Sequence, residues 1–540
     1  MVVTPNSRIR LLKSPIELDN KNQLTFSSEQ NQRNYFLSLP YLEYDNCSYQ
    51  RKDGVIRYET GNNPGEITYE DLLEYNYCMY QNEHYSNKWF YAFITEVKYI
   101  NDGMTEIKLE TDVMQSWKFE INYKPSFVER EHVNDDTIGL HTIPENLEMG
   151  DYIDQSVSTE EAKSFNFLQV DGRAPLIVIA CSDVKITGFD PGIGRRYSNI
   201  YSGLIYLTFP NEGAAETFMF YTATQFSESP IVAVFLAPVP LANPNLQWRT
   251  ASESAGGQSY EFTYNEVPYS ATADYMMSPS LSKTNYLDDN YIPKNKKLLT
   301  WPFKYFIISN NAGSNAEYKY ELFSTSSCNF QINGAIGVGC SIKLQPHSYN
   351  KKSGLNPLFS LDAGKLPTCG WINDAYTNWL TGNAVNIGIQ LGTDIAKVGV
   401  GAFTENPGII ANSALSIANT LGEVYQRSKI PLTAQGGVNQ GDFNYAWKLS
   451  FSVYRKSIKR EYAKIIDDYF SAYGYKVNSY KTPNIDGRTN WNYVKTIGLN
   501  ITGNIPQEDM QKIKDIYDNG VTLWHNPSTF LDYSQSNNII

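Results

Sequence analysis

Histidine and cysteine are the residues that most often carry catalysis or hold a metal ion, and neither forms a recognisable pattern in this chain. No two of the five histidines have the spacing of metal ligands: His84, His132, His141, His347 and His525. No C-x-x-C pair occurs among the six cysteines: Cys47, Cys78, Cys181, Cys328, Cys340 and Cys369. We expect these thiols to be reduced and mostly buried in a protein that folds in a cytosol.

Carboxylates are the other candidates for chemistry. His132 and His141 lie near four carboxylates in the sequence: Glu129, Glu131, Asp135 and Asp136. These residues together could form a metal site in a loop. A polar loop with capping carboxylates is the favoured interpretation. Adjacent carboxylates, as in Asp467-Asp468, point in different directions and do not converge on one substrate. Because no Walker loop, G-x-S-x-G elbow or dinucleotide fingerprint occurs either, we predict no catalytic residue, no metal and no cofactor.

The composition narrows the class of protein further. The chain has 540 residues and a formal net charge of −12, which disfavours general nucleic-acid binding because affinity for DNA comes largely from Lys and Arg. Its 40 tyrosines suit subunit interfaces and sheets with one solvent-exposed face. We see no signal peptide and no apolar run of 18 residues, so we expect a soluble resting protein.

The elements that would position any site are mainly strands. Trp89 to Ile100, a turn at 101–103 and the alternating run from Thr105 to Glu110 predict a long antiparallel hairpin with one wet face. We expect a short helix from Asp71 to Tyr80 to pack over it. Further short strands are predicted in the middle of the chain, at 174–180, 231–236, 305–308 and 342–344.

The C-terminal residues predict a regular α+β layer. We expect the following order: a strand at 449–453, a helix at 457–473 stopped by Gly474, a strand at 493–502, a helix opened by Pro506 and ended by Gly520, and a strand at 521–525. Two such β–α pairs predict helices lying on one face of a sheet.

The segment from Leu380 to Gly422 has the most unusual composition, since only Asp394, Lys397 and Glu405 are charged. Asn406-Pro407-Gly408 predicts a turn in its middle. On either side lie two weakly polar runs, at 384–402 and 409–426, each about 27–28 Å long if helical, close to the thickness of a bilayer core.

Small residues recur every four positions in these runs, which lets two helices approach closely. The candidate residues of this apolar loop are Gly388, Ile389, Gly392, Ile395, Val398, Val400, Phe403, Pro407, Gly408, Ile409, Ile410, Ala414, Leu415, Ala418, Leu421 and Gly422. A flexible loop or a buried helical hairpin is the plainer alternative. Interspersed amides, such as Asn386 and Asn412, weaken a membrane role but suit a segment stored in a wet cavity and later moved into lipid.

Five ordered blocks resemble the tail knob, or distal tail tube, proteins of small short-tailed phages of the Bacillus podovirus type. The blocks are Asn87 to Phe93, Glu110 to Trp117, Ser126 to Val133, Tyr473 to Asn478 and Asp518 to His525. Residues from about 150 to 440 could not be aligned in this way.

The resemblance implies a non-enzymatic virion protein at the tail tip, assembled in the host cytoplasm as a homohexameric tube. In such a tube, strands from both ends of each subunit form one β-barrel wide enough for an aqueous channel. The implied partners are further copies of the chain, a collar or proximal tail protein, genomic DNA that passes through the lumen without specific binding, and the host cell membrane. One apolar loop per subunit would plug the tube and enter the membrane at infection; 380–422 is our candidate.

The fold class that we predict is therefore α+β, dominated by β structure, and multidomain, with an inserted middle domain and a long apolar loop. We divide the chain into five segments: an N-terminal tube domain at 1–124, an inserted mixed β domain at 125–300, a second tube segment at 301–379, the plugging loop at 380–440 and a C-terminal α+β tube segment at 441–540.

Three rival functions remain open. A host-surface adhesin predicts glycan or teichoic-acid binding by the middle of the chain, and a cell-wall hydrolase predicts clearing in a zymogram. A pore-forming toxin would explain the apolar segment but not the blocks at the two ends, and it would normally need an export signal.

Overall fold

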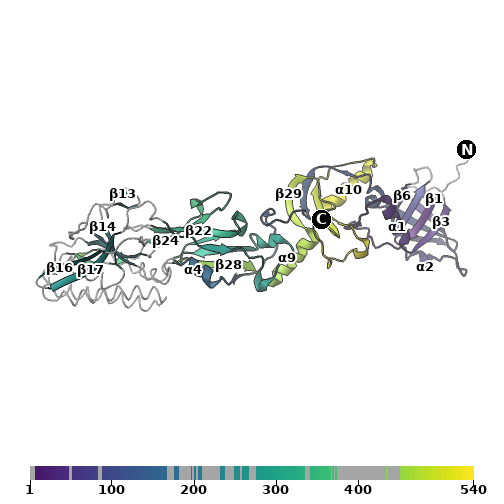
Figure 1. Ribbon diagram of the computed structural model, residues 1–540. Helices are drawn as coiled ribbons and strands as arrows, with labels where there is room; N and C mark the ends of the chain where they lie inside the picture. Colours follow the sequence, from purple (N-terminus) through teal and green to yellow (C-terminus); the bar gives the residue numbers. More distant parts are fainter. Residues whose placement is uncertain are drawn as a thin grey trace. The chain divides into compact units, whose positions relative to one another are not determined.

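The computed structural model describes residues 7–47, 52–82, 88–166, 176–181, 196–197, 200–201, 205–209, 231–237, 249–255, 258–266, 275–334, 341–365, 368–369, 371–373, 433–435 and 450–540. These residues are dominated by strands, with six α-helices among them (Figure 1). The chain divides into two compact units. Unit 1 combines Met1–Met149, Ile292–Leu298 and Arg460–Ile540, and unit 2 combines Gly150–Tyr291 and Leu299–Lys459. Our division into five functional segments stays a prediction.

Sheet A of unit 1 is a six-stranded antiparallel sheet in the order β3-β1-β5-β6-β7-β4. Its strands are β1 (Ser7–Leu12), β3 (Tyr41–Cys47), β4 (Val55–Glu59), β5 (Tyr77–Asn82), β6 (Trp89–Asn101) and β7 (Met104–Thr111). The predicted hairpin is confirmed as β6 and β7, which pair from Ala92↔Thr111 to Asn101↔Met104.

The helix that we predicted from Asp71 to Tyr80 is wrong over most of its length. Helix α2 covers only Tyr69–Leu72, where Thr68 and Asp71 form a capping box. The residues from Tyr77 onward enter β5, because their side chains are buried at the centre of the sheet. A run of β-prone aromatic residues with two strand neighbours overrides a weak helical pattern.

Sheet A curls until its two edge strands come close together. Strands β3 and β4 lie at opposite ends of the sheet order, yet they follow one another in the chain with only seven residues between Cys47 and Val55. A link of that length spans at most about 30 Å. The rings of Tyr44 on β3 and Tyr58 on β4 are 5.1 Å apart, so the sheet forms a half-barrel.

Sheet B of unit 1 is built from both ends of the chain. Its order is β2-β32-β30-β9-β29, with β2 (Asn22–Leu24), β9 (Ser126–Glu131), β29 (Tyr475–Lys481), β30 (Trp491–Ile497) and β32 (Val521–Trp524). Strand β2 pairs in parallel with β32, and β9 lies between β29 and β30. A small pair of β8 (Asn122–Tyr123) and β31 (Ile501–Thr502) accompanies this sheet.

The two C-terminal helices exist as predicted but pack on opposite faces of sheet B. Helix α9 (Arg460–Tyr473) contacts one face, where Tyr473 meets Tyr493 at 5.2 Å between ring centroids and the Ser471 carbonyl accepts a hydrogen bond from Trp491. Helix α10 (Gln507–Asn519) buries its apolar side against Val494, which points to the other face because successive strand residues alternate. The prediction of helices on one face is therefore wrong.

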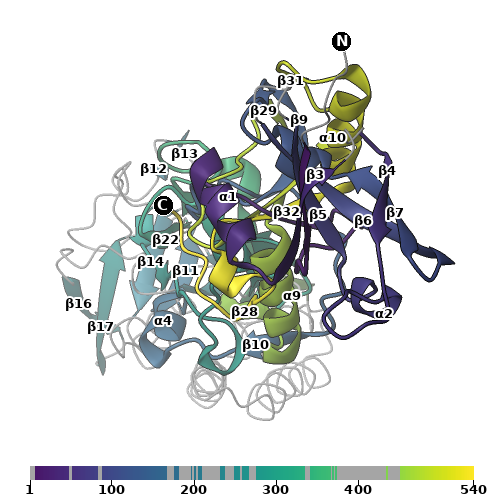
Figure 2. The ribbon, with the colours of Figure 1, turned by 90° about the vertical axis from the view of Figure 1, so that its right-hand side faces the viewer.

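Two shorter helices complete unit 1. Helix α1 (Glu29–Ser38) begins after Ser28, whose hydroxyl accepts the amide of Asn31, and it buries Phe36 in an aromatic cluster. Helix α3 (Val113–Trp117) begins after Asp112, whose carboxylate accepts two amides of the first turn. Figure 2 shows α1 lying across sheet A.

Unit 2 contains three larger sheets. One has the order β10-β28-β20-β21, with β10 (Tyr152–Gln155), β28 (Ser452–Ile458), β20 (Lys304–Ser309) and β21 (Asn315–Tyr318). The strand predicted at 449–453 instead begins at Ser452 and extends to Ile458, which also delays the start of α9. The second sheet contains β18 (Tyr275–Met277), β22 (Ser327–Asn333), β23 (Ser341–His347) and β24 (Leu361–Lys365), and β19 (Ser280–Ser282) pairs with β22.

The third sheet of unit 2 confirms the apolar runs at 174–180 and 231–236 as strands. Its order is β16-β17-β14-β11-β15-β25, with β16 (Arg249–Ala255), β17 (Gln258–Glu266), β14 (Ile205–Phe209), β11 (Leu176–Cys181), β15 (Ile231–Ala237) and β25 (Thr368–Cys369). The remaining described elements of unit 2 are α4 (Thr159–Ser164), β12 (Arg196–Tyr197), β13 (Ile200–Tyr201), β26 (Trp371–Asn373) and β27 (Thr433–Gln435). Short 3-10 helices lie at Asp288–Asn290, Lys296–Leu299, Tyr320–Leu322, Pro357–Phe359 and Pro527–Thr529.

Candidate functional site

The apolar loop predicted as a plug lies outside the described residues, including all its candidate residues from Gly388 to Gly422. What the structure describes is the base of this segment. Strands β26 and β27 pair antiparallel, with Trp371 opposite Gln435 and Asn373 opposite Thr433. The two ends of the segment 374–432 are therefore held side by side. Sequence reasoning missed this closure, because two three-residue strands give no readable periodicity.

No described helix combines the length and the apolar character that crossing a bilayer would require.

The histidines of the possible metal loop have structural partners instead. The ring of His132 is buried; its Nδ1 lies 2.7 Å from the Tyr493 amide and its Nε2 lies 3.0 Å from the Ser471 carbonyl oxygen. Nδ1 must therefore accept, and Nε2 must carry the proton that it donates. His141 Nε2 lies 2.8 Å from the carbonyl oxygen of Asp135. Within the described ranges, no three His, Cys, Asp or Glu side chains are grouped as metal ligands. Glu129 and Glu131 lie on strand β9 and not in a loop, so the polar-loop interpretation is wrong for these two residues.

Burial keeps two imidazoles neutral and makes the stability of unit 1 depend on pH. Burial lowers the pKa of His132 to about 3, helped by Arg488, and lowers the pKa of His525 to about 4. Both values lie below the ordinary 6.5, so the unfolded chain binds these protons first and the free energy of unfolding falls as pH drops from about 6.5 toward 4. Asp112 acts in the opposite direction, since burial raises its pKa to about 6, but its shift is smaller than the two histidine shifts combined.

We therefore expect unit 1 to lose stability on acidification to pH 4.5. Urea unfolding at pH 7 and pH 4.5, followed by hydrogen exchange in sheet B, measures this loss. In the folded chain, nitrogen chemical shifts of His132 should remain those of a neutral ring at pH 5. A His132 ring that titrates near pH 6.5 would contradict the assignment.

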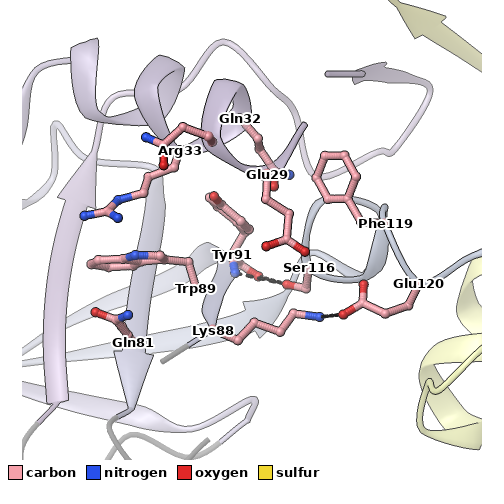
Figure 3. A pocket seen from close by; sticks show the side chains of 11 residues that line it. Glu29, Gln32, Arg33, Gln81, Lys88, Trp89, Tyr91, Ser116, Phe119 and Glu120 are labelled. Atoms are coloured by element: carbon pink, nitrogen blue, oxygen red, sulfur yellow. Dashed lines mark hydrogen bonds and ion pairs between the residues drawn. The ribbon is translucent and has the colours of Figure 1, made fainter. Parts of the chain in front are cut away.

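A polar pocket of about 370 Å³ lies between α1, α3 and the start of β6 (Figure 3). It is lined by Glu29, Gln30, Gln32, Arg33, Gln81, Lys88, Trp89, Tyr91, Ser116, Phe119 and Glu120. Lys88 forms an ion pair with Glu120, and the Ser116 hydroxyl bonds to both backbone groups of Tyr91. The Arg33 guanidinium stands over the Trp89 ring at 5.7 Å. The two acidic and two basic side chains of the pocket balance one another, and its lining pairs no nucleophile with a base. We therefore interpret the pocket as a place where α1, α3 and β6 pack together.

A buried ion network fastens the segment 292–298 inside unit 1. Glu145 pairs with Arg130 and, at 2.7 Å, with Lys297, and it also accepts the amide of Lys476 at 2.9 Å. Although burial acts to raise it, the pKa of Glu145 is lowered by Lys297 and by these hydrogen bonds. Burial lowers the pKa of Lys297. Nearby, the Asp467 carboxylate on α9 accepts the amides of Lys294 and Asn295.

Taken together, the described residues offer structural junctions and surfaces rather than a reaction centre. Sheet A forms a curled half-barrel, and sheet B joins the two ends of the chain. Strands β26 and β27 hold together the two ends of the segment 374–432.

Comparison with protein families gives two matches. Residues 268–538 match the model described as Bacillus phage phi29, tail knob protein gp9, C-terminal domain. Residues 5–122 match the caudoviral major tail protein N-terminus. The first match covers half of the chain and includes the sheet B strands β29, β30 and β32, and the second spans sheet A.

Similar proteins agree with these families over almost the whole length. The tail knob protein gp9 of Bacillus phage B103 is 25% identical, over 97% of this chain and 97% of its own. The tail knob protein gp9 of Bacillus phage PZA is 26% identical, over 96% of each. The solved structure of the bacteriophage C1 tail knob protein, gp12, covers 99% of this chain and 100% of its own, with a TM-score of 0.62 at 16% identity, and so shares the fold.

The resemblance read from the five sequence blocks is thus confirmed, and so is the prediction of a non-enzymatic protein, because it follows from the relatives. Tail knob proteins are parts of the virion tail. This chain belongs to the family of the phage tail knob protein gp9 and is a structural component of a phage tail.

Proposed function

We propose that six copies of this chain form the distal tube of a phage tail and that this tube conducts DNA into a bacterium. The observation that carries the proposal is sheet B, in which strands from the first and last parts of the chain pair with one another. A subunit whose two ends form one body, with a half-barrel beside it, can contribute curved sheets to a closed ring. Closure of a sheet around several subunits leaves an aqueous channel.

The apolar segment is the proposed plug of this tube. Its two ends are held together by β26 and β27, so the segment can move as one loop without unravelling the rest of unit 2. Six copies of a weakly polar loop can bury one another in the lumen and hide surface that would otherwise aggregate. The candidate residues are those between Gly388 and Gly422 named above.

Membrane entry is the second role of the loop in this proposal. Once expelled against a bilayer, the same apolar surface gains contacts with lipid. Its backbone groups stay satisfied there only if the two runs flanking Pro407 are helical. The small residues at every fourth position would allow such helices to pack closely.

The further partners follow from the position at the tail tip. Genomic DNA passes through the lumen without specific binding, since the net charge of −12 opposes retention of phosphates. A collar or proximal tail protein joins the other end of the tube, and assembly takes place in the host cytoplasm. Tight DNA binding by assembled tubes at physiological salt would contradict the passage of DNA.

A loop deletion tests the plug. We expect removal of Ala384 to Gln426, with β26 and β27 retained, to leave rings intact, open the lumen in electron micrographs and abolish leakage of dye from liposomes. A chain in which a Gly/Ser linker of equal length replaces the loop is the control, because it preserves length but not apolar surface. A lumen that stays closed in the deletion variant would refute the plug while leaving the tube in place.

A further inference from the structure

Unit 1 contains a second pocket, of about 480 Å³, where residues from the two ends of the chain meet. Three tyrosines line it: Tyr473, the last residue of α9, Tyr493 on β30, and Tyr533 near the C-terminus. Solvent reaches the pocket, since Tyr473 and Tyr533 are 41% and 37% exposed. The volume lies within the range of about 300–1,000 Å³ that is typical of small-molecule sites. We call this cavity the tyrosine pocket.

Aromatic packing holds the walls of the tyrosine pocket in place. The rings of Tyr473 and Tyr493 meet edge to face, with 5.2 Å between their centroids. The ring of Tyr533 packs at 5.2 Å against Trp491 and at 5.0 Å against Trp524. Because these side chains are already positioned by their neighbours, binding of a ligand requires little further ordering of the walls.

Gly520, which ends α10, makes room for the hydroxyl of Tyr493. The glycine has φ +97°, and a Cβ at this position would lie 2.2 Å from the Tyr493 Oη. A larger residue would therefore displace the tyrosine side chain. The glycine thus allows Tyr493 to reach the end of α10, whose last two turns contribute Asp515 and Asn519 to the same pocket.

Several polar groups of the lining are not used by the fold. Within the described part of the chain, the hydroxyls of Tyr473 and Tyr493 and the side-chain amide of Asn519 form no hydrogen bond. The Tyr533 hydroxyl lies 3.4 Å from Asn22 Oδ1, whereas ordinary O–H···O hydrogen bonds measure about 2.5–3.0 Å. These groups are therefore available to a ligand that both donates and accepts hydrogen bonds.

The charges of the lining disfavour an anionic ligand. Lys21 supplies the positive charge, and it is already paired with Asp19 at 3.1 Å. Asp515 accepts a hydrogen bond from Gln511 through Oδ1, which leaves Oδ2 as a further acceptor. Two carboxylates and one ammonium give the lining a formal charge of −1. A phosphate or carboxylate ligand would thus find no unpaired cation among these residues.

A neutral sugar fits this combination of groups. The hydroxyls of a pyranose ring donate and accept hydrogen bonds, as the tyrosines, Asn519 and Asp515 of the pocket require. Its C–H groups can pack against aromatic side chains. An organic cation would instead need several open ring faces around it, and the contact between Tyr473 and Tyr493 already occupies part of those faces.

We propose that the tyrosine pocket binds a neutral pyranose unit of a glycan. This binding activity goes beyond the proposed tube and does not depend on it. The pocket belongs to unit 1, whereas the adhesin hypothesis assigns glycan binding to the middle of the chain.

Binding of the full-length chain to neutral sugars tests this proposal. The probes are immobilised neutral oligosaccharides of hexoses and N-acetylhexosamines, and methyl glycosides of the same sugars in solution. We expect saturable binding to at least one of them, and no binding of choline or inorganic phosphate at the pocket. Binding of a methyl glycoside would assign the pocket to a single sugar unit, and binding of oligosaccharides alone would assign it to a longer stretch of glycan.

The double variant Tyr473→Phe, Tyr493→Phe locates the binding. It removes two hydroxyls that have no partner and keeps both rings, so its circular dichroism and urea midpoint should equal those of the parent chain. We expect it to bind the sugar about tenfold more weakly, because two hydrogen bonds are lost. Asp515→Ala, which removes an acceptor on the exposed side of α10, should weaken binding as well. Tyr480→Phe, at a 71% exposed position outside the pocket, should bind like the parent.

Three results would overturn the proposal: no neutral sugar binds, choline or phosphate occupies the pocket in place of a sugar, or the double variant binds the sugar as tightly as the parent. Ring formation by the parent chain is observed separately, by electron microscopy. A failure of the tube proposal is therefore distinguishable from a failure of this inference.

Discussion

Substitution of Gly474 by Ala is expected to destabilise unit 1 by about 3–5 kcal/mol. Gly474 ends α9 with φ +63°, and its amide bonds to the Phe470 carbonyl at 2.8 Å. A Cβ at this position would lie 2.1 Å from the Glu131 carbonyl oxygen and 2.5 Å from the His132 amide nitrogen. Both are backbone atoms of or beside β9, so no side chain can turn away to make room.

Gly498 provides a matched control for this substitution. It has nearly the same backbone conformation, φ +68°, but a Cβ there would meet no atom within 4 Å. Gly498→Ala therefore isolates the strain of a left-handed conformation, which costs about 1 kcal/mol. Urea unfolding, with hydrogen exchange of β9 as the local readout, compares the two variants. Equal losses of unfolding free energy in the two variants would show that the close approach of α9 to β9 does not contribute to the effect of Gly474→Ala.

Substitution of Glu145 by Ala is expected to cost about 3–5 kcal/mol, because it leaves Arg130 and Lys297 buried without their common counter-charge. The Lys476 amide loses its acceptor as well. Since the pKa of Glu145 is lowered in the folded chain, its stabilisation is present above the unfolded pKa of 4.5 and is lost as pH falls below it. The difference between parent and variant should therefore shrink on acidification.

Asp468→Ala is the surface counterpart. Asp468 pairs with Lys294 at 3.8 Å, and the two side chains are mostly exposed. Exposed pairs contribute little, so we expect a loss below about 0.5 kcal/mol. Urea unfolding at pH 7 measures both variants. A Glu145→Ala chain as stable as Asp468→Ala would mean that the buried network does not hold the segment 292–298 in unit 1.

Elements with a local signal could be read from the sequence. The β6–β7 hairpin follows from an alternating pattern on both sides of Asn101-Asp102-Gly103, and α9 and α10 follow from apolar stripes that end at Gly474 and Gly520. The helix predicted from Asp71 failed because the burial of Tyr77 between two neighbouring strands outweighs a weak local preference.

Features that depend on distant partners could not be read. The pairing of Leu24 with Trp524 joins residues at opposite ends of the chain, and neither short strand contains a pattern that predicts its partner. The ion network likewise unites Arg130, Glu145 and Lys297 from separate segments. The closure of the apolar loop by β26 and β27 belongs to the same class. The family, in contrast, was recognisable from ordered blocks at both ends.

The most direct measurement is an electron cryomicroscopy map of the assembled protein. The proposal predicts a six-fold ring in which the hairpins rooted at β26 and β27 converge on the axis and obstruct the channel. A map with an empty axis, or with the stretch from Gly388 to Gly422 lying against the outside of its own subunit, would contradict it.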